Sequence, residues 1–168
     1  AGCLAARDVS VTLLVSPKEV DQLAVKSAAH VKIVTLPAVG LSRGRMGAFL
    51  SGFWQSYRIS TRLFRQQLPD AALAMGGFTS AAPLLAAKRF GAPVFLHESN
   101  TIPGRANRWA SWVTDQAFVG FPEAAARLRT RRIIVTGTPV RSVFRPLDRG
   151  TCRAALGLDP LRPVALVM

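Results

Sequence analysis

Short apolar runs alternate with amphipathic helical patterns along this chain, and no other feature restricts its fold as strongly. Each apolar run has the length of a buried strand; the runs lie at residues 9–15, 31–36, 71–75, 93–96, 116–119 and 133–136. Helical patterns separate them, at residues 18–29, 46–67, 81–90, 104–113 and 123–129. Continuous apolar strands that alternate with helices predict an α/β fold, a mostly parallel sheet covered on both faces.

The domain organisation follows from the chain length and from a change of pattern near residue 140. A chain of 168 residues can bury one full core but not two. Residues 139–150 loosen into proline, arginine and glycine, and two further elements are expected at residues 151–156 and 164–168. We therefore predict a first domain over residues 1–140, and a linker with the start of a second domain over residues 141–168. The final apolar strand has no turn after it, which suggests a piece of a longer protein.

The net charge of +13 predicts an anionic partner, which could be a nucleic acid, an acidic membrane or a phosphorylated substrate. The segment at residues 41–67 narrows this choice, because on a helical wheel its aromatic and apolar side chains fall within an arc of roughly 140°. These side chains are Phe49, Leu50, Phe53, Trp54, Tyr57 and Phe64, with Arg58, Arg62 and Arg65 beside them. The arc either packs against the sheet or forms a patch that meets an anionic membrane surface. No nucleic-acid-binding motif is present, so nucleic acid is not expected as a partner.

Polar and small residues follow three of the predicted strands, where open parallel sheets bind their ligands. Gly76-Gly77 and the hydroxyls of Thr79 and Ser80 come after the first, and His97-Glu98-Ser99-Asn100 after the second. Gly137-Thr138-Pro139-Val140-Arg141 comes after the third. Each has a plain structural alternative: a tight glycine turn, a hydrogen-bonded histidine, or an ordinary surface arginine.

Together, these residues resemble the amino-terminal domain of the MurG family of peptidoglycan glycosyltransferases, from about residue 9 to residue 168. The resemblance rests on residues 75–80, 97–104, 107–109 and 137–141. It implies a GT-B fold, in which two Rossmann-like domains enclose the active site. It also implies an inverting enzyme, without metal or cofactor, that transfers N-acetylglucosamine from UDP-N-acetylglucosamine to undecaprenyl-pyrophosphoryl-N-acetylmuramyl-pentapeptide. Such an enzyme works as a peripheral protein at the cytoplasmic face of the bacterial cell membrane.

The resemblance also implies roles for individual residues. Asn100 and Arg141 would contact UDP-N-acetylglucosamine, and Gly76, Gly77, Phe78, Thr79, His97 and Glu98 would lie on the acceptor side. Phe49, Leu50, Phe53, Trp54, Tyr57, Arg58 and Arg62 would form the membrane patch. No catalytic base is assigned, and Glu98 is only a weak candidate. The family's first strand and first glycine-rich loop are absent from residues 1–140, and the glycine-rich loop of its second domain would follow Met168. We therefore expect no turnover from this chain alone.

Two alternatives remain open. The first is another GT-B enzyme that glycosylates a lipid, such as a diacylglycerol glycosyltransferase, because fold and loop chemistry do not determine the acceptor. The second is a non-enzymatic α/β module that binds anions or membranes, in which the glycines only form turns.

Overall fold

The structure is a computed structural model. It describes residues 4, 6–19, 21–22, 31–42, 44–140 and 144–166. The chain divides into two compact units, Ala1–Thr138 and Pro139–Met168, and each is described by itself.

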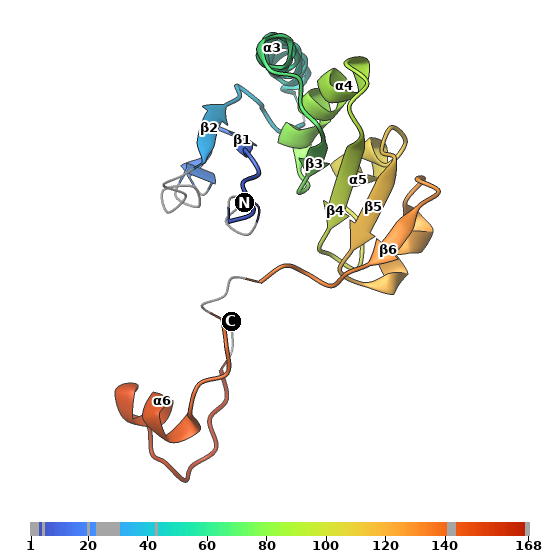
Figure 1. Cartoon of the computed structure of the whole chain (residues 1–168). Helices are drawn as coiled ribbons and strands as arrows, with labels where there is room; N and C mark the ends of the chain where they lie inside the picture. Colours follow the sequence, from blue (N-terminus) through green and yellow to red (C-terminus); the bar gives the residue numbers. More distant parts are fainter. Residues whose placement is uncertain are drawn as a thin grey trace. The chain divides into compact units, whose positions relative to one another are not determined.

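The first unit is built on parallel strands, as the sequence predicts (Figure 1). Strand β1 (Thr12–Val15) pairs with β2 (Lys32–Thr35), and both strands run in the same direction. A second sheet holds four parallel strands in chain order: β3 (Ala72–Ala74), β4 (Val94–Glu98), β5 (Gln116–Val119) and β6 (Ile133–Val135). The carboxyl ends of β3 to β6 therefore lie at one edge of this sheet.

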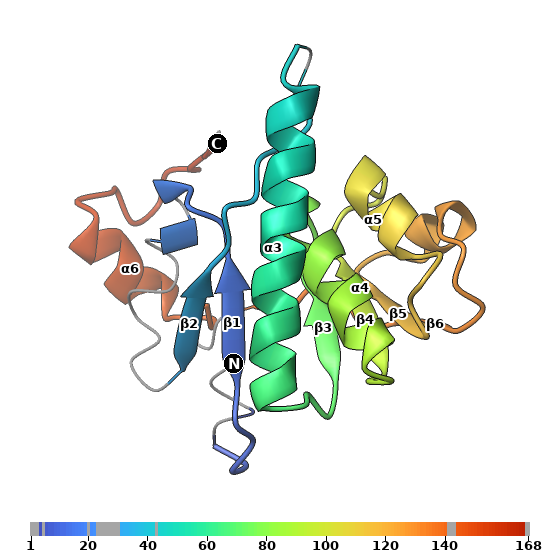
Figure 2. The same cartoon turned by 90° about the horizontal axis from the view of Figure 1, so that it is seen from above.

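Helical segments connect the strands of the first unit, and Figure 2 shows the longest of them, α3, lying beside α4. The α-helices are α3 (Met46–Gln66), α4 (Ala81–Arg89) and α5 (Arg105–Ala110). Two 3-10 helices, η1 (Phe78–Ser80) and η2 (Pro122–Arg127), precede α4 and β6. Helix α4 ends at Arg89, and Gly91, the predicted stop signal, follows two residues later with a φ of 77°. There the amides of Gly91 and Ala92 donate back to the carbonyls of Lys88 and Ala87, at 3.0 and 3.2 Å.

The core lies on one face of the four-stranded sheet. Small and branched strand residues face α4, α5 and η2 there, and the most buried are Ala74, Val94, Leu96, Ala117 and Val119. Alanine at two of these positions lets the helices lie close to the strands, so the interior is filled without large side chains. The opposite face is more open, with Leu73 and Ile134 both exposed.

Helix α3 packs through a stripe of small residues. Its buried positions are Gly52, Ser56, Ser60 and Phe64, each one helical turn after the last. A Cβ atom at Gly52 would lie 2.5 Å from the carbonyl oxygen of Pro37, so only glycine permits this approach. The hydroxyls of Ser56 and Ser60 donate to the carbonyls four residues earlier, at 2.7 and 2.8 Å, which satisfies these polar groups inside the interface.

One ion pair connects α4 to the sheet at the amino ends of the strands. Lys88 pairs with Asp115, and the other carboxylate oxygen of Asp115 accepts a hydrogen bond of 2.8 Å from the amide of Val94. The hydrogen bond from Lys88, followed by that from Val94, lowers the pKa of the Asp115 carboxyl.

The second unit contains helix α6 (Arg149–Ala155), which begins two residues before its predicted start. Asp148 caps it, because its carboxylate accepts hydrogen bonds from the amide and the hydroxyl of Thr151, at 2.7 and 2.8 Å. These hydrogen bonds, the backbone one first, lower the pKa of Asp148.

Several predicted boundaries differ from the structure. Strand β4 continues through His97 and Glu98, because these residues pair with Phe118 and Val119 of β5. The helix predicted at residues 123–129 is a 3-10 helix, since the short segment between β5 and β6 closes with bonds of the i to i+3 type. Residues 164–166 form no strand and pair with no described strand. Of the helix predicted at residues 18–29, residues 20 and 23–29 lie outside the described residues.

Candidate functional site

A cavity of about 250 Å³ lies where β3 and β4 end. The Gly76-Gly77 loop, the turn after Glu98 and the beginning of α5 line it. Its lining residues are Met75, Gly76, Gly77, Glu98, Ser99, Asn100, Gly104, Arg105, Ala106 and Asn107. Two loops that are about twenty residues apart in the chain therefore meet in one site, at the edge where parallel sheets bind ligands.

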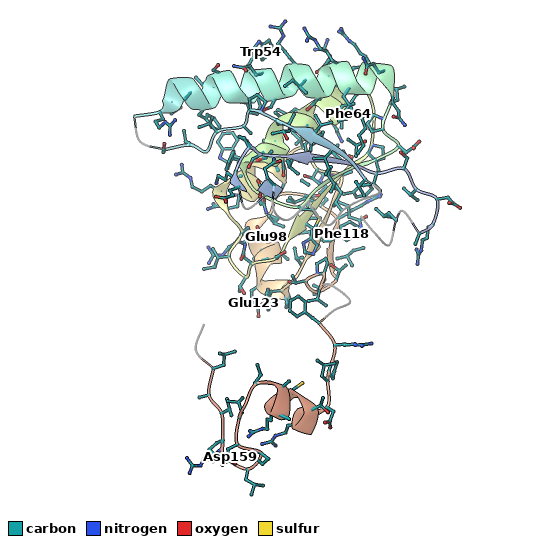
Figure 3. All side chains as sticks on the ribbon, turned by 90° about the vertical axis from the view of Figure 1, so that its left-hand side faces the viewer. Trp54, Phe64, Glu98, Phe118, Glu123 and Asp159 are labelled. Atoms are coloured by element: carbon teal, nitrogen blue, oxygen red, sulfur yellow. The ribbon has the colours of Figure 1, made fainter. Side chains whose placement is uncertain are left out.

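Glu98 organises this site. Its side chain is 1% exposed and lies deep in the unit, away from α3 (Figure 3). Oxygen Oε1 accepts hydrogen bonds from the amide and the side-chain Nδ2 of Asn100, at 2.8 and 2.9 Å. Oxygen Oε2 accepts from Asn107 Nδ2 at 2.8 Å and from the amide of Gly104 at 3.3 Å. Four donors thus occupy both oxygens, which favours a positioning role for Glu98 over proton transfer.

The Gly-Gly loop lies against Asn107. Gly76 and Gly77 have φ values of 100° and 85°, which side chains rarely adopt. A Cβ atom at Gly76 would also lie 3.0 Å from Asn107 Nδ2. The hydroxyl of Ser80 donates to the Gly76 carbonyl at 2.8 Å and holds the loop from its other side. The same asparagine therefore contacts Glu98 and the glycine loop, and it joins the two halves of the site.

His97 belongs to a different contact, because neighbouring side chains of a strand point to opposite faces. Its Nε2 lies 3.1 Å from the carbonyl oxygen of Gly137, and its Nδ1 lies 3.3 Å from the hydroxyl of Ser99. A carbonyl oxygen only accepts, so Nε2 carries a hydrogen and donates to Gly137. A Cβ atom at Gly120 would lie 2.6 Å from Thr138 Oγ1, so the ends of β5 and β6 also approach closely here.

The other predicted site residues lie elsewhere. The Phe78 ring does not line the cavity; it lies against Gly40, with the Lys18 ammonium 4.8 Å from its centre. Thr79 is half-buried in η1, and Arg141 lies outside the described residues. No group of three or more His, Cys, Asp or Glu side chains could hold a metal ion in the part of the chain that the structure describes.

Sequence reasoning singled out Ser80 as a hydroxyl near the site and residues 107–109 as part of the resemblance, but it assigned no role to Asn107 or Arg105 and did not foresee that Ser80 holds the loop. Asn107 and Arg105 line the cavity, and Ser80 holds the glycine loop. A sequence signal for Asn107 existed, because a carboxylate at the end of a buried strand needs donors and asparagines follow it two and nine residues later. No comparable signal distinguished Arg105 from the other arginines.

The aromatic arc of α3 is divided between packing and exposure. Phe64 is 7% exposed and belongs to the core, whereas Leu50 and Trp54 are 57% and 58% exposed. Phe49, Phe53 and Tyr57 are half-buried, and Arg58 and Arg62 are exposed. Figure 3 shows Trp54 on the outer side of α3 and Phe64 beneath it. The packing interpretation therefore holds for Phe64 but not for Leu50 or Trp54, because the buried stripe consists mainly of small residues. No helix in the described ranges combines the length and apolar character needed to cross a bilayer.

The fold and the cavity define a parallel α/β domain of the kind that binds ligands beyond its strand ends. Comparison with known protein families assigns this domain to one family. The chain belongs to the family described as the glycosyltransferase family 28 N-terminal domain, which matches residues 1–119.

Individual relatives agree with this assignment. The chain is 38% identical over 140 residues to an enzyme of Chlorobium luteolum named UDP-N-acetylglucosamine–N-acetylmuramyl-(pentapeptide) pyrophosphoryl-undecaprenol N-acetylglucosamine transferase. That alignment covers 79% of this chain and 38% of the relative. A Nocardioides protein of the same name is 33% identical over 168 residues, which cover 95% of this chain and 44% of the relative. The chain thus spans about two fifths of the length of these curated relatives.

A solved structure shares the fold. The crystal structure of Acinetobacter baumannii MurG superimposes with a TM-score of 0.66 at 22% sequence identity. The superposition covers 87% of this chain and 42% of that one.

Proposed function

We propose that this chain is the acceptor-side part of a glycosyltransferase that moves N-acetylglucosamine from UDP-N-acetylglucosamine to undecaprenyl-pyrophosphoryl-N-acetylmuramyl-pentapeptide. The observation that carries the proposal is the meeting of the Gly76-Gly77 loop and the Glu98 turn in one cavity. The family and the names of the relatives support the donor and the acceptor.

The cavity offers donors to the oxygens of a pyrophosphate. The glycine loop leads into η1 and α4, and the first amides of such a helical segment have no acceptor within the helix. With no side chain at Gly76 or Gly77, a phosphate can approach these amides closely. Arg105, an exposed residue at the cavity wall, adds a positive charge. We assign the acceptor pyrophosphate to this side of the site.

Asn100 is the residue assigned to the donor sugar. Glu98 holds both its amide and its side-chain nitrogen, so the side-chain oxygen is presented in one orientation. In the proposed reaction, the acceptor hydroxyl forms a bond to the anomeric carbon of N-acetylglucosamine. The bond from that carbon to the β-phosphate oxygen breaks, UDP leaves with the electron pair, and the hydroxyl proton passes to a base outside the residues assigned here. A single displacement of this kind inverts the anomeric centre.

The exposed aromatic and basic side chains of α3 support attachment to a membrane. Leu50 and Trp54 stand clear of the core, and Arg58 and Arg62 are exposed on the same helix. Aromatic and apolar side chains that enter the headgroup region beside arginines bind anionic bilayers peripherally. We place the protein at the cytoplasmic face of the bacterial cell membrane, where it would meet its lipid-linked acceptor.

The test measures transfer from radiolabelled UDP-N-acetylglucosamine to the lipid-linked muramyl-pentapeptide by the full-length enzyme that contains this chain. We expect Asn100→Ala and Arg141→Ala each to lower kcat/KM by about tenfold to a hundredfold, the effect of removing a hydrogen bond to a substrate. Thr101→Ala is the matched control, because Thr101 is exposed and does not line the cavity. Thermal unfolding of each variant separates a loss of binding from a loss of fold.

Two results would contradict the proposal. Full activity of both Asn100→Ala and Arg141→Ala would remove the site assignment. Transfer to diacylglycerol, with none to the muramyl-pentapeptide lipid, would replace the acceptor with that of another lipid glycosyltransferase.

A further inference from the structure

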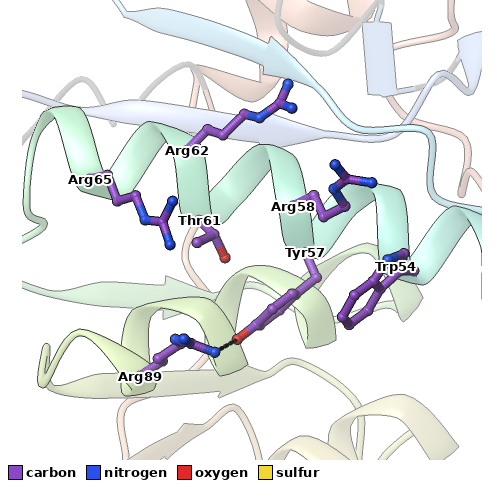
Figure 4. A pocket seen from close by; sticks show the side chains of 7 residues that line it. All are labelled: Trp54, Tyr57, Arg58, Thr61, Arg62, Arg65 and Arg89. Atoms are coloured by element: carbon purple, nitrogen blue, oxygen red, sulfur yellow. Dashed lines mark hydrogen bonds between the residues drawn. The ribbon is translucent and has the colours of Figure 1, made fainter.

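His97 is a buried titratable side chain to which the proposed reaction gives no step. It is 4% exposed, although strand register places it on the more open face of the sheet, the face of Leu73 and Ile134. It does not line the strand-end cavity, and it does not line the groove between α3 and α4 that Figure 4 shows. The partners that explain this buried ring therefore lie within the protein.

The ring of His97 holds the chain just after β6. Its Nε2 donates to the carbonyl oxygen of Gly137 at 3.1 Å, two residues after β6 ends at Val135. The same carbonyl oxygen also accepts a hydrogen bond of 3.2 Å from the hydroxyl of Thr136. Gly137 has a φ of 74°, a conformation that glycine adopts without strain, and the chain turns here. The turn after β6 is therefore tied to β4 by a buried side chain.

Two further contacts hold the residues on either side of Gly137. The amide of Thr136 donates to the carbonyl of Val119 in β5 at 3.0 Å. Thr138 lies against Gly120, where a Cβ atom would come within 2.6 Å of the threonine Oγ1. Three consecutive residues, 136–138, are thus held by β4 and by the end of β5, and His97 supplies the contact from β4.

These three residues are the last of the first unit. That unit ends at Thr138, and Pro139 begins the second. Proline fixes its own φ and restricts the residue before it to extended conformations, so a Thr-Pro step is stiff. The direction in which the chain leaves the first unit therefore depends on how residues 136–138 are held.

We propose that His97 is a positioning residue that fixes where and in which direction the chain leaves the first unit. This role rests on the proposed function in one respect: Arg141, assigned there to UDP-N-acetylglucosamine, follows Thr138 by three residues. His97 then acts on the sugar donor through the chain that it holds, without touching a substrate and without transferring a proton. This differs from the acceptor-side place that the family resemblance implies for it.

The test compares substitutions in the full-length enzyme that contains this chain. His97→Gln keeps an N–H donor for the Gly137 carbonyl, because the amide nitrogen of glutamine reaches about as far from the backbone as Nε2 does. His97→Leu fills the buried position without a donor. Phe95→Leu is the matched control, because Phe95 lies two residues earlier on the same face, where it stacks on Phe118 and makes no contact with this hydrogen bond.

A fourth variant perturbs the same contact without changing the buried histidine. Gly137→Ala has open space for its Cβ atom, but its φ of 74° disfavours a side chain, so the carbonyl should move away from Nε2. It should change each measurement in the same direction as His97→Leu, and it decides the question if His97→Leu does not fold.

Hydrogen exchange measures the anchor itself. We expect the amide of Thr136 to exchange about tenfold faster in His97→Leu, the effect of losing one buried hydrogen bond nearby, and at close to the parent rate in His97→Gln. Phe95→Leu should not single out Thr136 among the amides of the sheet. Parent-like exchange of Thr136 in both His97→Leu and Gly137→Ala would overturn the proposal.

Calorimetric binding of UDP-N-acetylglucosamine measures the consequence. We expect His97→Leu to bind the donor about tenfold more weakly, while its KM for the lipid-linked acceptor stays within about twofold of the parent value. His97→Gln should restore donor binding. Rescue by a side chain that cannot exchange a proton near neutral pH separates a positioning role from acid–base catalysis.

Two further results would overturn the proposal. Loss of transfer in His97→Gln despite parent-like exchange of Thr136 would show that the ring itself acts on a substrate. A raised acceptor KM in His97→Leu with unchanged donor binding would place His97 at the acceptor. If the parent enzyme binds no UDP-N-acetylglucosamine, the proposed function fails, whereas the exchange of Thr136 still decides whether His97 holds the chain.

Discussion

The buried carboxylate of Glu98 offers the sharpest test of how the strand-end cavity is built. In Glu98→Gln, the side chain keeps its shape, but an NH₂ group replaces one of the two accepting oxygens. Oxygen Oε1 holds the shorter pair of contacts, to Asn100, and Oε2 holds one short and one long contact, to Asn107 and Gly104. We therefore expect the amide nitrogen to take the place of Oε2, where it would face two donors.

The expected loss of stability follows from the two contacts of Oε2, to Asn107 and to Gly104. Each hydrogen bond to a charged acceptor contributes about 1.5–3 kcal/mol, so losing both would cost about 3–6 kcal/mol. Asn107 can rotate its amide and accept from the new NH₂ group, which recovers one contact and leaves the amide of Gly104 without an acceptor. We expect the free energy of unfolding to fall by about 2–3 kcal/mol, a large part of the stability of a typical domain.

Urea unfolding followed by circular dichroism measures this change. With a slope of about 1–3 kcal/mol per molar urea, the midpoint should fall by about 1 M. Glu123→Gln is the matched control, because Glu123 is exposed in η2, and its midpoint should stay close to that of the parent. Equal midpoints for Glu98→Gln and the parent would refute the claim that four donors hold this loop. A double-mutant cycle with Asn107→Ala should also show coupling of about 1 kcal/mol or more.

Three further predictions concern the scaffold. Gly52→Ala should destabilise the protein by about 1–3 kcal/mol, because its Cβ would meet the Pro37 carbonyl at 2.5 Å. Gly47→Ala, in open space on the same helix, should stabilise the protein by about 0.5–1 kcal/mol, and unfolding temperatures that change in the same direction for both variants would contradict this prediction. Gly120→Ala should lower the unfolding temperature, because its Cβ would lie 2.6 Å from Thr138 Oγ1, and an unchanged value would mean that this edge can relax. The pKa of Asp115 is lowered in the folded state, so its contribution is present above the unfolded pKa of about 3.9 and is lost as the pH falls through the folded value. The difference in urea midpoint between the parent and Asp115→Asn should therefore be largest near neutral pH and vanish in acid; a difference that grows in acid would contradict this sign.

The predictable part of the fold is the part governed by local pattern. The amphipathic period placed α3 at residues 46–67, and the helix occupies Met46–Gln66. Apolar runs located β3 to β6 within two residues at each boundary. Gly91 marked the end of α4, because a left-handed residue closes the last turn. Such signals are local, since they depend on side chains a few residues apart.

The candidate site was predictable as a place but not as a set of contacts. Gly76, Gly77, Glu98 and Asn100 were expected near one another, because strand ends of a parallel sheet meet at one edge, and all four line the cavity. The need of Glu98 for donors marked Asn107 only as one possible partner, and its position beside Gly76 was not predictable, because it depends on where α5 packs. The 3-10 geometry of η2 was not predictable either, since alanines at residues 124–126 favour an α-helix locally.

By itself, the sequence determined the α/β class, the order of its elements and the strand edge where a ligand would bind, because the hydrophobic period and the breaks in it are properties of neighbouring residues. Only the tertiary structure decided which side chains remain available. It occupied the oxygens of Glu98 with four donors and turned His97 towards Gly137, whereas it left Leu50 and Trp54 of α3 exposed. Burial and hydrogen-bond partners depend on segments that meet only after folding, and no local pattern encodes them.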